Sequence, residues 1–221
     1  MIRYSIQCAT FAACLVSAHA NAELVNIAID GTVAFSVIQG NQATVPDGAP
    51  VAMSFNVDSN VFLNSGSFPT RGYNIILSSF TMTVGGQPVP IVNPQPGGQT
   101  AYFVLRNNDP AVDGFFISTN VNVPFPVAVS IPGLAQTHDL DFSATYSSGS
   151  TLSSLNILDA VGTYGLNGIS SFLWTIGLFG NPGAEYNYES MTISVVPGPG
   201  ALVSMSLLAC FMRPGRRRRG T

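Results

Sequence analysis

The chain has 221 residues, of which 46% are hydrophobic and only 9% are charged, whereas about a quarter of the residues of an average globular protein are charged. Its polarity comes from 61 Ser, Thr, Asn and Gln residues, against eight Arg, eight Asp, three Glu and no Lys. This composition excludes a nucleic-acid-binding protein, which needs many basic side chains, and it excludes a highly charged disordered chain.

The first 22 residues have the three parts of a secretory signal peptide. Arg3 supplies an early positive charge, residues 9–16 are apolar, and Ala18, Ala20 and Ala22 form two overlapping small-residue exit patterns. We predict cleavage after Ala22, with cleavage after Ala20 as the alternative. The expected partners are therefore the Sec translocon and signal peptidase, and the protein is expected to be exported.

Residues 23–196 are predicted to form one all-β domain, a single antiparallel β-sandwich or jelly roll. About ten short runs alternate apolar with small polar residues, and turn-forming residues separate them every eight to twelve positions or so. Asp30-Gly31 lies between two alternating runs and predicts a β-hairpin. Glycine pairs at Gly85 and Gly97 predict a meander, and Leu152–Ala160 is the one stretch that favours a short helix or helical turn.

The charge of this predicted domain differs from that of the whole chain. All eleven acidic residues lie in it, but only Arg71 and Arg106 of the basic ones, so its formal charge is −9 instead of −3. The three cysteines, Cys8, Cys14 and Cys210, lie outside it. The domain is therefore expected to have neither a disulfide nor a thiolate metal site.

Residues that carry catalysis are scarce in the domain. His138 is its only histidine and no Gly-x-Ser-x-Gly sequence occurs, which argues against a zinc site and a serine hydrolase. We therefore predict that His138 lies in a solvated loop and that the protein is not an enzyme.

Asp139 and Asp141 are the most suggestive carboxylate pair. Two residues apart on a strand, they point to the same face roughly 6.5 to 7 Å from each other, a spacing that suits a glycosidase or a cation. The favoured interpretation is an exposed polar face with Leu140 and Phe142 turned inward.

Two further groups have a possible ligand role and a structural alternative. Asp109 and Asp113 are weak Ca²⁺ candidates, since they lie in an Asn- and Asp-rich stretch without EF-hand spacing; no other cofactor is expected. Tyr186 and Tyr188 share one strand face and suit sugar stacking, but we favour a place for them in the core, together with Trp174.

The C-terminus has the plan of a membrane-directed segment. A Pro/Gly hinge precedes an apolar block, residues 201–212, and a basic cluster of Arg213, Arg216, Arg217, Arg218 and Arg219. As a helix the block rises only about 18 Å, and extension back to Val195 reaches the lower limit for a span of about 30 Å. The arginines would stay cytoplasmic, which leaves the domain outside.

This combination of ends resembles the PEP-CTERM sorting signal of bacterial surface proteins. The match consists of the Pro197, Gly198 and Pro199 motif, the short hydrophobic helix and the terminal arginines; Gly198 stands where that family usually has Glu. The resemblance implies that an exosortase-like enzyme removes residues 197–221 after transient inner-membrane anchoring. A permanent single-span anchor is the alternative.

Together these features predict a non-enzymatic protein of the cell surface or extracellular matrix. The resemblance adds an association with exopolysaccharide, in a structural or interaction role, through a weakly charged face of Ser, Thr and Asn that tolerates neutral glycans. The alternative is a carbohydrate-binding module or a carbohydrate-active enzyme that uses Asp139 and Asp141.

Overall fold

Alternation of buried and exposed side chains defines the long strands of the domain. The computed structural model describes residues 23–178 and 181–197. In it, β1 (Leu24–Ser36), β2 (Pro50–Asn64), β9 (Thr137–Tyr146) and β12 (Asn181–Val195) bury every second side chain over most of their length. A strand with this pattern has one face in a core and one in water.

Shorter strands and single helical turns complete the structure. The strands are β3 (Thr70–Ile75), β4 (Thr81–Val84), β5 (Gln87–Pro88), β6 (Tyr102–Arg106), β7 (Asp113–Ser118), β8 (Val127–Ser130), β10 (Gly162–Gly165) and β11 (Ile169–Leu178). The 3₁₀ turns are η1 (Gly40–Gln42), η2 (Leu77–Ser79), η3 (Pro96–Gly98) and η4 (Ile157–Ala160). Within Leu152–Ala160 the predicted helical turn is confirmed as η4, where the Asn156 side chain accepts a hydrogen bond from the backbone N–H of Leu158 at 3.2 Å.

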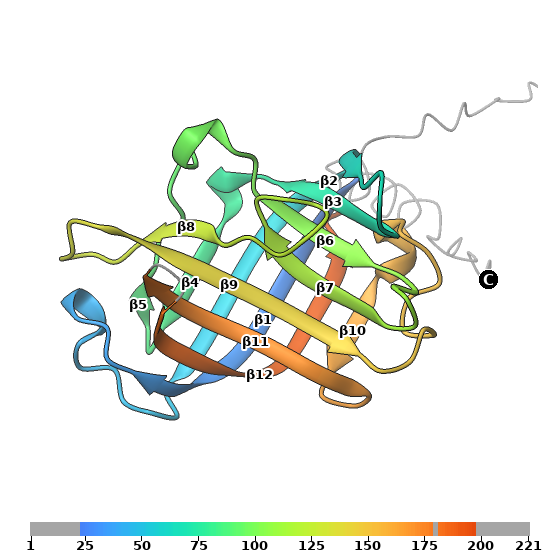
Figure 1. Cartoon of the computed structure of the whole chain (residues 1–221). Helices are drawn as coiled ribbons and strands as arrows, with labels where there is room; N and C mark the ends of the chain where they lie inside the picture. The colour runs from blue at the N-terminus through green and yellow to red at the C-terminus, as the bar shows by residue number, and fades with distance from the viewer. Residues whose placement is uncertain (1–22, 179–180, 198–221) are drawn as a thin grey trace, which may run out of the picture.

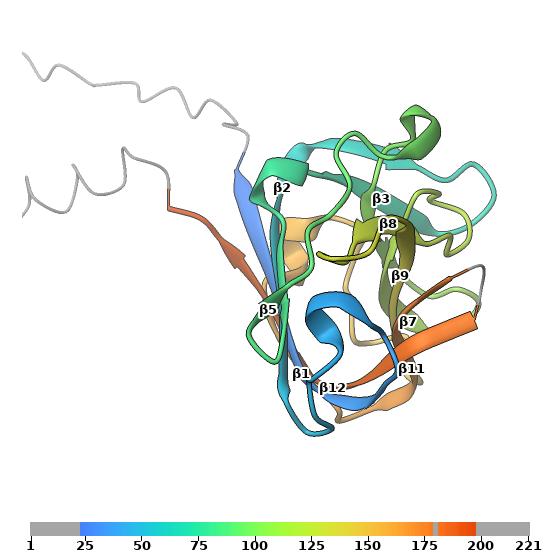
Figure 2. The same ribbon diagram turned by 90° about the vertical axis from the view of Figure 1, so that its left-hand side faces the viewer.

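The paired strands close into a ring. Their order is β1-β12-β11-β9-β7-β6-β3-β2, and β2 pairs again with β1; all pairs are antiparallel. β4 and β5 extend from β2, while β8 lies beside β9 and β10 beside β12. The ring is flattened into two layers, with β1, β2 and β12 on one side and β6, β7 and β9 on the other (Figures 1 and 2). The predicted all-β, antiparallel, sandwich-like fold is confirmed.

Aromatic side chains fill the space between the layers. Phe55 of β2 meets Phe103 of β6 with ring centroids 5.7 Å apart, and Phe115 of β7 meets Tyr164 of β10 at 4.7 Å. Such contacts across the core stabilise the domain through burial of large apolar surfaces.

The two ends of the described chain lie together. β1 and β12 run side by side in opposite directions (Figure 2), and the N–H of Val196 donates to the carbonyl of Leu24 at 2.8 Å. We call this the termini end. At the opposite end, which we call the distal end, Ser36 pairs with Ala184. The 13 residues of β1 separate these ends by about 40 Å.

The hairpin predicted at Asp30-Gly31 is wrong. β1 continues through both residues, and Gly31 pairs with Val51 on one side and Tyr188 on the other, next to a register shift. A Cβ at Gly31 would lie 2.0 Å from the carbonyl oxygen of Asn187. Glycine is therefore needed here for the close approach of two strands at a bulge, which is the other common role of glycine in a sheet.

The predicted meander forms only in part. Gly85 and Gly86, with φ values of 58° and 80°, make the tight turn between β4 and β5. The turn at Gly97 leads instead into β6, which pairs with β3 and β7. The predicted signal peptide and the tail from Gly198 onward lie outside the described residues. Within the described ranges, no helix has the length and apolar character needed to cross a membrane.

Candidate functional site

A broad face of mostly uncharged polar side chains covers one layer. We call it the polar face; its members are exposed or half-buried and lie on five neighbouring strands, β10, β12, β1, β2 and β4. They are Asn26, Asp30, Ser54, Asn56, Asp58, Thr81, Thr83, Thr163, Ser190, Thr192 and Ser194. One row shows the register: Thr163 pairs with Thr192, Thr192 with Ala28, Ala28 with Ser54, and Ser54 with Thr81.

Hydrogen bonds between neighbouring strands hold the polar face in order. The Asn26 amide donates to Ser54 Oγ at 3.0 Å and to Asn56 Oδ1 at 2.9 Å. The hydroxyls of Thr163 and Thr192 lie 3.3 Å apart. Short side chains lose little rotamer entropy when they are fixed in this way, so the face presents ordered donors and acceptors with little charge.

Asp139 and Asp141 lie on the outer side of β9, as predicted, with Leu140 and Phe142 in the core. Strand pairing adds a third carboxylate, because Asp141 pairs with Thr175 and Thr175 pairs with Glu185 of β12. We call Asp139, Asp141 and Glu185 the acidic row. Glu185 alternates with the core residue Tyr186 and therefore faces outward, but the order of residues does not show which strand lies beside it.

The acidic row lines a small surface depression of about 160 Å³. Small-molecule sites usually have about 300 to 1,000 Å³, so this depression is too small to enclose a sugar ring. Burial raises the pKa of Asp141, and repulsion from Asp139 raises it further. Among the residues that the structure describes, no group of three or more His, Cys, Asp or Glu is arranged to hold a metal ion.

Asp113, one of the two weak Ca²⁺ candidates, connects two loops. Its carboxylate is fully buried; Oδ1 accepts the N–H of Asn108 at 2.9 Å and Oδ2 accepts that of Leu152 at 2.7 Å. Asp109 is half-buried in the loop before β7. These hydrogen bonds explain the position of Asp113 without a cation.

The three aromatic residues predicted in the core are buried there. Trp174 is 1% exposed, and Tyr186 and Tyr188 are each 2% exposed. The Tyr188 hydroxyl donates to the Tyr164 carbonyl at 2.6 Å, and burial raises the pKa of Tyr186 and Tyr188, and that of Tyr164 to about 12. Their rings are therefore not available for stacking on a sugar.

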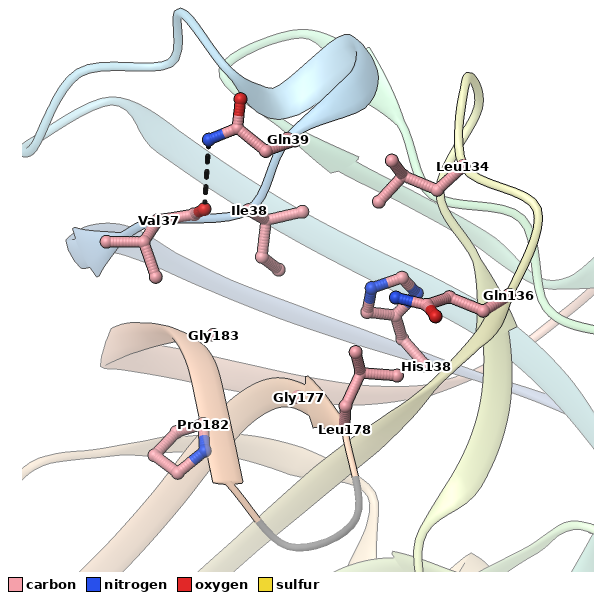
Figure 3. Close-up of a pocket in the computed structure, with 10 residues that line it drawn as sticks. All are labelled: Val37, Ile38, Gln39, Leu134, Gln136, His138, Gly177, Leu178, Pro182 and Gly183. Atoms are coloured by element: carbon pink, nitrogen blue, oxygen red, sulfur yellow. Dashed lines mark hydrogen bonds between the residues drawn. The ribbon is translucent and has the colours of Figure 1, made fainter.

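The solvated loop predicted for His138 is wrong. His138 belongs to β9, pairs with Val129 of β8 and is only 4% exposed. Leu140 and Phe142 are buried at every second position of β9, and His138 is the next residue in this series toward the N-terminus. The same alternation therefore predicts that His138 is buried. Its imidazole lines a pocket of about 370 Å³ at the distal end, together with Ile38 and Leu178 (Figure 3).

The predicted processing residues lie almost wholly outside the described ranges. Pro197 follows β12 and is exposed; the remaining ones are not described, namely Ala20, Ala22, Gly198, Pro199, Arg216, Arg217, Arg218 and Arg219. Comparison of the chain with protein-family models, with curated proteins and with solved structures finds no match.

Proposed function

We propose that this chain is an exported bacterial surface or matrix protein, and that its β domain contacts neutral polysaccharide through the polar face. The observation that carries the glycan contact is the continuity of that face over five strands. Export and sorting rest on the predicted signal peptide and on the resemblance of the tail to a PEP-CTERM signal. The proposed role is passive adhesion and not catalysis.

The chemistry of the polar face suits an uncharged glycan. Each sugar hydroxyl donates and accepts, and the Ser, Thr and Asn side chains of the face do the same. Binding between neutral partners avoids the desolvation of ions. Asp30 and Asp58 are the charged members of the face, and the exposed Glu189 lies beside Ser190 on β12, so most of the groups that would be removed from water are uncharged.

The position of the chain ends supports delivery by a removable tail. The last strand ends beside the start of the first, and the N–H of Glu23 donates to Ser59 Oγ at 3.1 Å. Cleavage near Ala22 and near Pro197 would therefore leave both new ends at one end of a closed domain. Attachment by that end keeps the polar face, which runs along the strands, exposed at the side.

Tail processing can be tested in the producing bacterium by the mass and location of the protein. We expect a chain that ends at Val196 to lose surface attachment, and the double variant Pro197→Ala/Pro199→Ala to accumulate as the longer, membrane-held form. Gly198→Glu restores the usual motif and should leave processing intact. Normal surface display of the truncated chain would contradict the sorting proposal, and an unchanged full-length mass at the surface would identify a permanent anchor.

Glycan contact can be tested by affinity electrophoresis in gels that contain a neutral polysaccharide from the producing bacterium. Thr192→Lys places a long charged side chain in the middle of the polar face, and we expect binding to weaken at least about tenfold, a loss of about 1.4 kcal/mol. Ser171→Lys is the matched control, since Ser171 is exposed on β11 outside the polar face. Equal retardation of both variants and the unchanged protein would contradict a contact through this face.

The acidic row is the feature that a second candidate function, a carbohydrate-active enzyme, would use; such an enzyme would have to act on a glycan that lies across the surface, because the depression does not enclose a sugar ring. The raised pKa of Asp141 beside Asp139 is what a general acid in such a pair requires. Hydrolysis of a glycan by the purified protein, lost in Asp139→Asn or Asp141→Asn, would favour this candidate over passive adhesion.

A further inference from the structure

The pocket at the distal end has the size of a small-molecule site. Its volume of about 370 Å³ falls within the usual range of roughly 300 to 1,000 Å³. Ile38 comes from the segment after β1, Leu134 from the loop before β9 and Leu178 from the end of β11; Figure 3 shows the three side chains around the His138 ring. The closure of the strand ring brings these distant segments together.

His138 is the unsatisfied polar group of this pocket. Its Nδ1 is buried and has no hydrogen-bond partner among the described residues. Buried polar atoms in folded proteins almost always have a partner, because a missing one lowers stability. The Cβ–Cγ torsion of histidine is broad and roughly two-fold, so a half-turn of the ring exchanges the positions of Nδ1 and Cδ2. An unpaired imidazole in a preformed pocket points to a hydrogen-bonding group supplied by a ligand.

The charges around the pocket favour an uncharged ligand over an anion. Gly177 and Pro182 line both this pocket and the depression of the acidic row, so an anion would be repelled by three nearby carboxylates. The described residues that line the pocket include no Asp or Glu, so a cation would be attracted by the acidic row but would have no ion-pair partner in the pocket itself. Arg71 and Arg106 lie on β3 and β6 and are not among the lining residues.

We propose that the distal pocket binds an uncharged small molecule that has an apolar body and one hydroxyl group. The apolar body lies against Ile38, Leu134 and Leu178, and the hydroxyl hydrogen-bonds to the imidazole of His138. A hydroxyl both donates and accepts, so it satisfies either neutral form of the ring.

This inference goes beyond the proposed function, because it concerns a different surface of the domain. The polar face binds along the side of one layer, whereas the pocket opens at the end that lies opposite the chain termini. Only the orientation of the pocket, away from the membrane, rests on the proposed tail attachment.

The test measures binding of three matched probes to protein purified after expression of the full chain with both its ends. The probes are 2-naphthol, naphthalene and 2-naphthoate, followed by ligand fluorescence. We expect 2-naphthol to bind at least about tenfold more tightly than naphthalene, the equivalent of one hydrogen bond. We also expect 2-naphthoate to bind more weakly than 2-naphthol, because of the acidic row.

Three variants separate the pocket from other surfaces. His138→Phe keeps an aromatic wall but lacks the nitrogens, so 2-naphthol should fall to the affinity of naphthalene. Leu134→Trp fills the pocket and should weaken both neutral probes at least about tenfold. Leu166→Trp alters a leucine that is 54% exposed and lies outside the pocket, and it should change neither affinity.

Two results would overturn the inference: no saturable binding of 2-naphthol to the unchanged protein, or unchanged binding in Leu134→Trp. If His138→Phe folds and still prefers 2-naphthol to naphthalene, the assigned hydrogen bond is wrong. Failure of these probe experiments leaves surface delivery and glycan retardation unaffected, so it is distinguishable from failure of the proposed function.

Discussion

Replacement of Asp113 by Asn should destabilise the domain, because both carboxylate oxygens are needed. The side chain is fully buried, and it accepts the N–H of Asn108 at 2.9 Å and the N–H of Leu152 at 2.7 Å. An Asn side chain has one acceptor oxygen and turns its NH₂ group toward the second N–H. One buried backbone donor then loses its partner.

The magnitude follows from that lost contact. A hydrogen bond to a charged group contributes about 1.5 to 3 kcal/mol, and an unsatisfied buried donor costs a similar amount. We therefore expect the free energy of unfolding to fall by about 3 kcal/mol. For a domain of this size the melting temperature falls by about 2 to 4 °C per kcal/mol, so the expected drop is roughly 6 to 12 °C.

Thermal unfolding followed by circular dichroism, with and without EDTA or added Ca²⁺, measures this effect. Asp109→Asn is the matched control, since its side chain makes no hydrogen bond to the residues that the structure describes, and it should leave the melting temperature unchanged. A decrease in melting temperature smaller than about 1 °C in Asp113→Asn would show that the two hydrogen bonds of Asp113 do not stabilise the domain. So would an unchanged protein that melts in EDTA as early as the variant, because Asp113 would then act through bound Ca²⁺.

Three further predictions concern stability. Gly31→Ala should lower the free energy of unfolding by about 3 kcal/mol, because its Cβ would lie 2.0 Å from the Asn187 carbonyl oxygen and 2.9 Å from the Trp174 ring. Urea unfolding measures this loss. The control Gly66→Ala, whose Cβ would have no atom within 4 Å, should unfold like the unchanged protein. Tyr73→Phe removes a buried hydroxyl that donates to the Leu155 carbonyl at 2.8 Å and accepts from the Ile157 N–H at 2.9 Å. The free energy of unfolding should therefore fall by about 2 to 4 kcal/mol. A decrease as small as that of the control Tyr102→Phe would contradict this. Burial and repulsion from Asp139 raise the pKa of Asp141, so the folded state holds this proton more tightly than the unfolded state. The stability that the proton contributes is lost as the pH rises from the ordinary pKa of 3.8 through the raised pKa. The stability of Asp141→Asn relative to the unchanged protein should therefore increase between pH 3 and pH 7 in urea unfolding experiments, and a difference that does not change with pH would contradict this.

The class of fold was predictable because a two-layer β domain has to bury one face of each strand. Val25, Ile27 and Ile29 of β1 are each fully buried, and Asn26 and Ala28 between them lie on the outer face. The period of two is a local property, and it is readable from the order of the residues alone.

Asp30-Gly31 and His138 show where local patterns fail. Asp-Gly fits a hairpin turn, but here the strand β12 lies so close to Gly31 that only glycine fits. Turn-forming residues precede His138 in the sequence, yet it pairs with Val129 of β8 as part of β9, and its imidazole is buried. In both cases the decisive neighbour is distant in the sequence.

By itself, the sequence determined the composition of the domain, its strong negative charge, the period of its strands and the expectation that both ends are processing signals. The tertiary structure alone decided that Glu185 joins Asp141, that Thr163 and Ser54 belong to one polar face, and that His138 lines a pocket. Strand order and register set these neighbours, and they depend on packing across the whole closed ring, which no short stretch of residues specifies.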